Sequence, residues 1–199
     1  RKVGEIDRME ETLTDLANAS RRVSLKTGEQ IGIDIVAFNT YLAAICDAVV
    51  KGLPFPTSAT SISADDNIDD GEMTGFNFTT LENISSKTSG SEKYLYKAVN
   101  LLRGDTARTR FALGGDPDEY SYNQVLNAAA KCSKSDGDDY FTKSIILSCL
   151  RGMKDRGIQP NMFTYNARLQ ATIASDDQDA AVKLIDQIIS DQIRSDQIR

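Results

Sequence analysis

Three stretches of the chain repeat one order of apolar and polar positions. They begin at Gly32, Gly114 and Gly157, and each runs through a short polar turn to an aromatic residue, an Asn, and a Leu three positions after the Asn. After the turn, apolar residues recur every three or four positions, which is the period of an amphipathic helix. Each stretch is therefore predicted to be a turn followed by a helix. The apolar residues of the three helices are Phe38, Leu42 and Ile45, then Tyr122 and Leu126, then Tyr165, Leu169 and Ile173.

A second amphipathic helix is predicted after each first one. The second helices cover 92–104, 138–157 and 177–189, and a further helix of this kind covers 5–20. Ser89 with Glu92, and Ser175 with Gln178, have the spacing of a capping box. Because one helix pair cannot bury its apolar face alone, the pairs are predicted to stack into an all-α, right-handed superhelical solenoid. The apolar faces hold Leu95, Ala98 and Leu102, then Ile146, Leu150 and Met153, then Ala181, Leu184, Ile185 and Ile188.

The repeats divide the chain into four parts. These are a partial repeat at 1–34, a repeat with an insertion at 35–118, a repeat at 119–161, and a last repeat with an irregular tail at 162–199. The tail contains SDQIR twice, which either extends the last helix or is an artefact.

The insertion at 54–91 interrupts the pattern. It is rich in Ser, Thr, Asp and Gly without a sustained apolar period, so we predict that it is disordered. Within it, Phe76, Phe78 and Leu81 are candidates for a short docking motif. The insertion contains one lysine and holds nearly all of the chain's net charge of −6, so the repeats themselves are near neutral. Its acidic residues are Asp65, Asp66, Asp69, Asp70, Glu72 and Glu82.

The chemistry available to the chain is narrow. It has no His, which removes histidine triads and the common zinc sites, and no phosphate-binding loop or CxxC is present. The Asp cluster at 65–70 lacks the ligand spacing of an EF-hand loop. We therefore expect no metal, no cofactor and no enzymatic activity.

The cysteines and the hydropathy bear on location. Cys46, Cys132 and Cys149 lie inside predicted helices, which favours buried thiols in a reducing compartment over disulfides. No apolar run approaches the length of a membrane span, so no membrane association is expected.

These patterns together resemble the pentatricopeptide repeat family. The motif GIQPNMFTYNARL with DAAVKLIDQII is the closest match, and DPDEYSYNQVL with LRGMKDRGIQPN is also similar. The resemblance covers most of the chain outside 54–91. The chain departs from the family in its insertion and in the span from Asn123 to Asn166, which exceeds the family's repeat of about 35 residues.

The resemblance implies binding of single-stranded RNA, with one base read by two side chains of each repeat. The implied base-reading residues are Asn39, Asp118, Asn123, Asn161 and Asn166. In the family, Asn with Asp resembles a uracil reader and Asn with Asn a pyrimidine reader. The resemblance also implies an organellar factor in RNA processing, stability or translation, located in mitochondria or plastids, with the cytoplasm as the alternative.

Other positions follow from the same resemblance. Val36, Tyr120 and Phe163 match the residues that pack against a base. The two aromatics depart from the family's usual aliphatic residue but can stack on a base. Lys131 matches a phosphate contact, whereas Asp47 and Ala174 do not.

Two other interpretations stand beside RNA binding. The Asn residues can serve only to join repeats, while Asp34, Asp118 and Asn161 can serve only as helix N-caps, which Asp and Asn favour. The small number of basic residues also leaves open a scaffold that binds a protein segment, because nucleic-acid affinity depends largely on Lys and Arg.

Overall fold

The fold is built from α-helices. The computed structural model describes residues 2–28, 32–55, 89–103, 111–112, 114–132, 140–174 and 178–197. The regular structure of these ranges is helical, with no β-sheet. The helices are α1 Lys2–Thr27, α2 Ile35–Val50, α3 Gly90–Leu102, α5 Glu119–Cys132, α6 Tyr140–Asp155, α7 Met162–Ala174 and α8 Gln178–Gln197.

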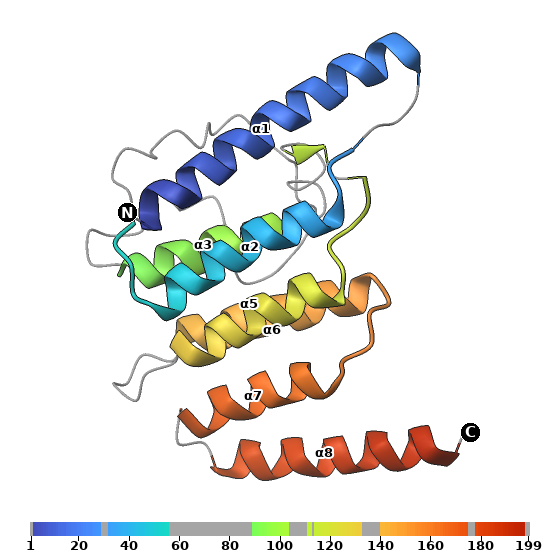
Figure 1. The fold of residues 1–199 in the computed structure, drawn as a ribbon. Helices are drawn as coiled ribbons and strands as arrows, with labels where there is room; N and C mark the ends of the chain where they lie inside the picture. Colours follow the sequence, from blue (N-terminus) through green and yellow to red (C-terminus); the bar gives the residue numbers. More distant parts are fainter. Residues whose placement is uncertain are drawn as a thin grey trace, which may run out of the picture.

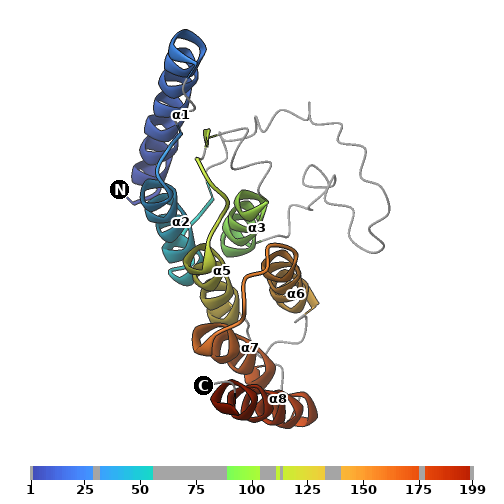
Figure 2. The ribbon, with the colours of Figure 1, turned by 90° about the vertical axis from the view of Figure 1, so that its right-hand side faces the viewer.

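The helices pack in two layers. The first helices of the repeats, α2, α5 and α7, lie side by side in one layer, and α3 and α6 lie behind them (Figures 1 and 2). α3 contacts both α2 and α5, and α6 contacts both α5 and α7. α1 packs against α2, and α8 packs against α7. The predicted all-α, repeat-like architecture is therefore confirmed, while the right-handed superhelical solenoid stays a prediction.

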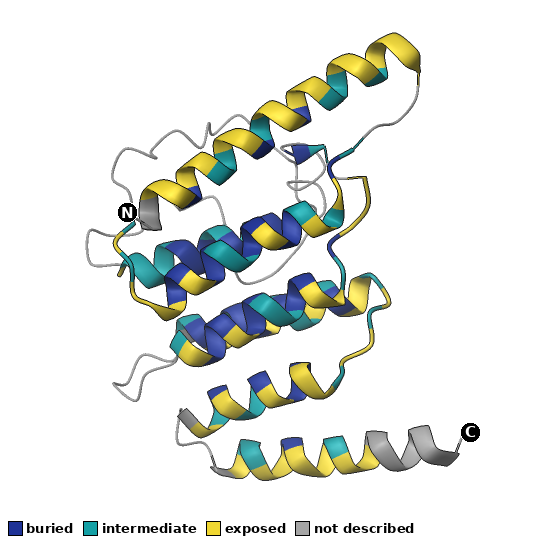
Figure 3. Cartoon of the chain, in the orientation of Figure 1, coloured by how far each residue is buried: buried dark blue, intermediate teal, exposed yellow. Residues whose placement is uncertain are grey.

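The core follows the predicted apolar faces. Phe38, Leu42 and Ile45 of α2 are fully buried, and Tyr122 and Leu126 of α5 are buried beside them (Figure 3). Each of these helices is covered on both sides by neighbours. At the other end, Ile185 of α8 is exposed on a helix that, among the described helices, contacts only α7. Ile173 of α7, also on a predicted apolar face, is exposed as well.

Helix boundaries differ from the sequence-based prediction mainly at the outer helices. α1 runs well past the predicted range of 5–20 and stops before Gly28, whose φ of +73° favours glycine and whose N–H donates to the carbonyl of Ser24. α8 continues to Gln197, so the first SDQIR and the start of the second extend the last helix. The predicted capping box of Ser89 and Glu92 is confirmed at the start of α3, while that of Ser175 and Gln178 lies partly outside the described residues.

The insertion is described only at its borders. Phe55 packs edge-on against Tyr94 with ring centroids 4.8 Å apart, and the Tyr94 hydroxyl donates to the carbonyl of Pro54. α3 already begins at Gly90, inside the range 54–91 assigned to the insertion. The predicted disorder, the acidic cluster and the docking motif fall on 56–88, outside the described residues.

The turns that lead into α2 and α5 pair with each other. The Ile33 N–H donates to the carbonyl of Ala112 at 2.9 Å, and the Gly114 N–H donates to the carbonyl of Ile33 at 3.2 Å. A Cβ at Gly32 would lie 2.6 Å from backbone atoms of Ala112 and Gly114. This close backbone contact brings the N-terminal ends of α2 and α5 together.

Gly32→Ala is therefore expected to lower the free energy of unfolding by about 1–3 kcal/mol, because the clash is with backbone that cannot rotate away. Urea unfolding followed by circular dichroism measures the change. Gly4→Ala in α1 is the control, since a Cβ there meets nothing within 4 Å and alanine favours the helix. Equal stability of the two variants would show that the paired turns do not hold α2 and α5 in place.

Candidate functional site

The junction between α2 and α5 joins a helix cap to an inter-repeat bridge. Asp118 caps α5, because its Oδ1 accepts from the Ser121 N–H at 2.9 Å. The Asn39 Nδ2 of α2 donates to the same Asp118 Oδ1 at 3.2 Å. The Ser121 hydroxyl completes the cluster by donating to Asn39 Oδ1 at 2.6 Å. The two predicted base-reading residues of this repeat are thus in direct contact.

The junction between α5 and α7 repeats this arrangement. Asn161 caps α7, because its Oδ1 accepts from the N–H groups of Phe163 at 2.9 Å and Thr164 at 3.1 Å. The Asn123 Nδ2 donates to Asn161 Oδ1 at 3.3 Å, and the Thr164 hydroxyl donates to Asn123 Oδ1 at 2.8 Å. The structure therefore pairs Asn123 with Asn161 as it pairs Asn39 with Asp118.

Ser121 and Thr164 are the members of these clusters that sequence reasoning missed. Both stand three residues after a capping Asp or Asn, the spacing at which an N-cap side chain meets a backbone N–H. That spacing, present as Asp118 to Ser121 and Asn161 to Thr164, was the available signal.

Large apolar side chains flank the polar pairs. Val36, Tyr120 and Phe163 occupy the second position of α2, α5 and α7, and their exposed fractions are 64%, 62% and 72%. Side chains of this size are usually buried, so their regular exposure at one position of each repeat sets them apart from the core. They are the three residues that the resemblance assigns to packing against a base.

At the junction between α2 and α5, which we call the first junction, Val36 and Tyr120 border a pocket of about 450 Å³. The junction between α5 and α7 is the second junction. The pocket volume lies within the range of about 300–1,000 Å³ that is usual for small-ligand sites. Apolar side chains from two helices and the polar Asn39–Asp118 pair share its lining. The lining residues are Ile35, Val36, Asn39, Thr40, Ala43, Asp118 and Tyr120.

Asp118 is the charged group of the pocket. Burial would raise the pKa of its carboxyl group, but hydrogen bonds from the backbone and hydroxyl of Ser121 and from Asn39 outweigh this and hold the pKa below its ordinary value of 3.8. The group is therefore ionised at neutral pH. Its contribution to stability is complete above about pH 4 and is lost as the pH falls through the lowered pKa.

The remaining predicted site residues do not join these clusters. Asn166 of α7 is exposed, and in the described part of the chain no first helix follows α7 to supply a capping partner. Lys131 is exposed in the last turn of α5. Asp47, at the corresponding position of α2, forms an ion pair with Lys51.

The three cysteines lie within helices as thiols. Cys46 and Cys149 are buried, as expected, and Cys132 is partly buried. Burial raises the pKa of the Cys46 thiol to about 12 and raises that of Cys149 as well, so neither forms a thiolate readily.

Within the described residues, no helix combines the length and apolar character needed to cross a bilayer. Over the same part of the chain, no group of three or more Cys, Asp or Glu side chains is placed to hold a metal ion.

Comparison of the chain with protein-family models, with curated proteins and with solved structures gave no match.

Proposed function

We propose that this chain is a single-stranded RNA-binding repeat module that holds one base at each junction between successive first helices. The pocket at the α2–α5 junction is the observation that supports this most strongly. It combines exposed side chains, Val36 and Tyr120, with a hydrogen-bonding pair in which Asn39 is buried and Asp118 is partly buried. A nucleobase has the matching surfaces, because its faces are apolar and its edge carries donors and acceptors.

The side chains suggest how each surface of a base would be held. Tyr120 offers a ring on which a base can stack, a contact that contributes about 1–3 kcal/mol per base. Val36 contributes an aliphatic surface to the same pocket. The base edge would then meet Asn39 and Asp118.

The state of Asp118 defines which base edge fits. The hydrogen bonds that the described residues make to its carboxylate all end on Oδ1, and none is seen on Oδ2 there. An ionised carboxylate accepts hydrogen bonds and donates none. The pocket should therefore prefer a base that presents an N–H at the middle of its pairing edge, as uracil does at N3.

The affinity of this chain alone should be low. Among the predicted contacts only Lys131 places a positive charge near the first-helix layer, and the net charge of the chain is −6. Since neutralisation of phosphates provides most nonspecific affinity, binding should be weak and should change little with salt. In the proposed role the chain works within an organellar RNA processing, stability or translation factor, without catalysis.

Asp118→Asn tests the proposal without removing the cap, because Asn also caps helices. The expected result is a loss of at least about fivefold in the preference for oligouridine over oligocytidine, since a good base-edge contact provides about 1–3 kcal/mol of discrimination. Fluorescence anisotropy with labelled pentanucleotides at low salt measures both affinities. Asp34→Asn is the matched control, because Asp34 caps α2 but does not line the pocket. An unchanged preference in Asp118→Asn would count against base reading at this junction.

A helical-repeat scaffold for a protein segment is the second candidate. It is favoured by the small number of basic residues and by exposed apolar side chains at the start of α7, where Met162 and Phe163 are 55% and 72% exposed. If the chain is a scaffold, a peptide should remain bound in the presence of excess oligouridine. If the face binds RNA, oligouridine should compete with the peptide.

A further inference from the structure

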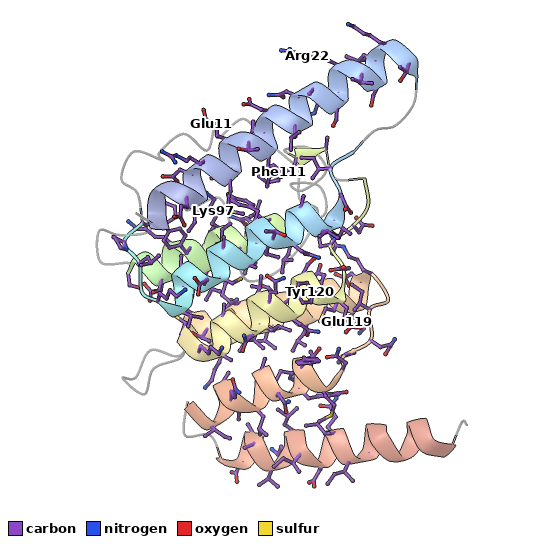
Figure 4. All side chains as sticks on the ribbon, in the orientation of Figure 1. Glu11, Arg22, Lys97, Phe111, Glu119 and Tyr120 are labelled. Carbon is purple, nitrogen blue, oxygen red and sulfur yellow. The ribbon has the colours of Figure 1, made fainter. Side chains whose placement is uncertain are left out.

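The two junctions have different residues at the position directly before the base-packing residue. Ile35 precedes Val36 at the start of α2, whereas Glu119 precedes Tyr120 at the start of α5. Figure 4 shows Glu119 and Tyr120 together at the N-terminal end of α5. The Glu119 carboxylate accepts a hydrogen bond from Asn161 Nδ2, so an acidic group contacts the Asn123–Asn161 pair.

The orientation of the Asn161 amide follows from its other partners. The backbone N–H groups of Phe163 and Thr164 both donate to one side-chain atom, and only the carbonyl oxygen can accept them. The NH2 group must therefore face Glu119. Asn123 Nδ2 also donates to the Asn161 oxygen, and the Thr164 hydroxyl lies 3.2 Å from it, so the carbonyl is already engaged.

The position of Glu119 relative to a ligand follows from the first junction. There the equivalent residue, Ile35, lines the pocket together with Val36 and Asp118. Glu119 occupies the same first position of its helix, directly before Tyr120. At the first junction a ligand would approach Asp118. A ligand that approached Asn161 in the same way at the second junction would therefore meet the Glu119 carboxylate.

We propose that Glu119 is a specificity-determining residue of the second junction. Its carboxylate holds an N–H of Asn161 and offers its second oxygen as an acceptor to the base. The second junction then selects a base with an N–H at the middle of its pairing edge, as the first does, in place of the general pyrimidine preference implied for an Asn–Asn pair. This inference rests on the proposed RNA-binding function.

Uracil and cytosine are the appropriate probes for this choice. They share ring size and stacking area, but uracil has an N–H at position 3 where cytosine has an acceptor nitrogen. A change in their relative affinity therefore reports the hydrogen-bonding edge and not the fit of the ring.

The test is a titration of the 15N-labelled chain with oligouridine and oligocytidine pentanucleotides. The side-chain amide signals of Asn39 report the first junction, and those of Asn123 and Asn161 report the second. For the natural chain we expect uridine to be preferred at both junctions. In Glu119→Gln, whose amide can donate to cytosine N3, the preference at the second junction should fall about fivefold or more, with the first junction unchanged. Glu119→Ala should also lower the uridine preference at the second junction, because the Asn161 N–H that Glu119 held is then free to donate to cytosine N3.

Glu11→Gln on α1 is the matched control, because it removes the same charge from an exposed position on another helix (Figure 4). Unchanged preference at the second junction in both Glu119 variants, with normal uridine binding at the first, would overturn the role of Glu119 alone. Absence of signal changes at both junctions with either oligonucleotide would instead overturn the proposed function. An equal change in Glu11→Gln would show a general charge effect and would also overturn the role of Glu119.

Discussion

Tyr122→Ala is expected to lower the free energy of unfolding by about 3–5 kcal/mol, the usual cost of removing a large buried ring. Tyr122 of α5 is 2% exposed, and its ring lies in the centre of the helix layers. Its hydroxyl accepts from Arg156 Nη1 at 2.7 Å and is 3.4 Å from the carbonyl of Leu102. The residue therefore joins α5 to α3 and to the end of α6. Urea unfolding followed by circular dichroism measures the loss.

The neighbouring Tyr120 provides the matched control. Tyr120 is 62% exposed on the same helix, so Tyr120→Ala should change stability by less than about 0.5 kcal/mol. The same variant should weaken oligouridine binding, because the stacking ring is lost. If Tyr120→Ala destabilised the chain as much as Tyr122→Ala, the assignment of one tyrosine to the core and the other to a ligand would be wrong.

The second large effect is expected at the ion pair between α1 and α3. Lys97 Nζ contacts Glu10 Oε2, and the two side chains are 11% and 16% exposed. Lys97→Met leaves Glu10 as a nearly buried charge without this partner. We expect a loss of about 2–3 kcal/mol, somewhat less than for a fully buried pair. The measurement is again urea unfolding, with hydrogen exchange showing whether α1 is the helix that becomes less protected.

Two further variants separate the pair from general effects. Lys93→Met removes a lysine one turn earlier on α3 and should have little effect on stability. Adding Glu10→Gln to Lys97→Met should recover part of the loss, because it removes the carboxylate charge that Lys97 balanced. If the double variant were as unstable as the sum of the single ones, the ion pair would not be what joins α1 to α3.

The apolar period predicted the helices well because it records burial directly. Phe38, Leu42 and Ile45 recur with the period of a helix, and each is fully buried. The end of α1 was harder to predict, because the polar residues after position 20 favour a helix but carry no apolar period. Gly28 marks that end through a backbone conformation that becomes evident only in the structure.

The candidate site was predicted in part. The family resemblance implied Asn39, Asp118, Asn123 and Asn161 as site residues, and the structure brings these four together in pairs. Periodicity did not identify Ser121, Thr164 or Glu119, because their roles depend on contacts between helices about 40 or 80 residues apart in the chain. Such contacts leave no periodic trace within one helix.

Capping and base reading are compatible at the first junction. Asp118 uses Oδ1 to cap α5 and to accept from Asn39. This use aligns the carboxylate with the pocket, and the lowered pKa keeps it ionised. The structural role thus orients the group that the proposed function requires, as is usual where binding groups are held by rigid elements.

Photo-crosslinking can show directly whether a base binds at the α2–α5 junction. A short oligouridine containing one 4-thiouridine is irradiated with the chain, and the attached peptide and residue are identified by mass spectrometry. The account predicts attachment at the α2–α5 junction, at Tyr120 or its pocket neighbours, with strong competition by oligouridine and weaker competition by oligocytidine. Attachment confined to other surfaces, or attachment that oligouridine does not suppress, would contradict the claim that this junction binds a base.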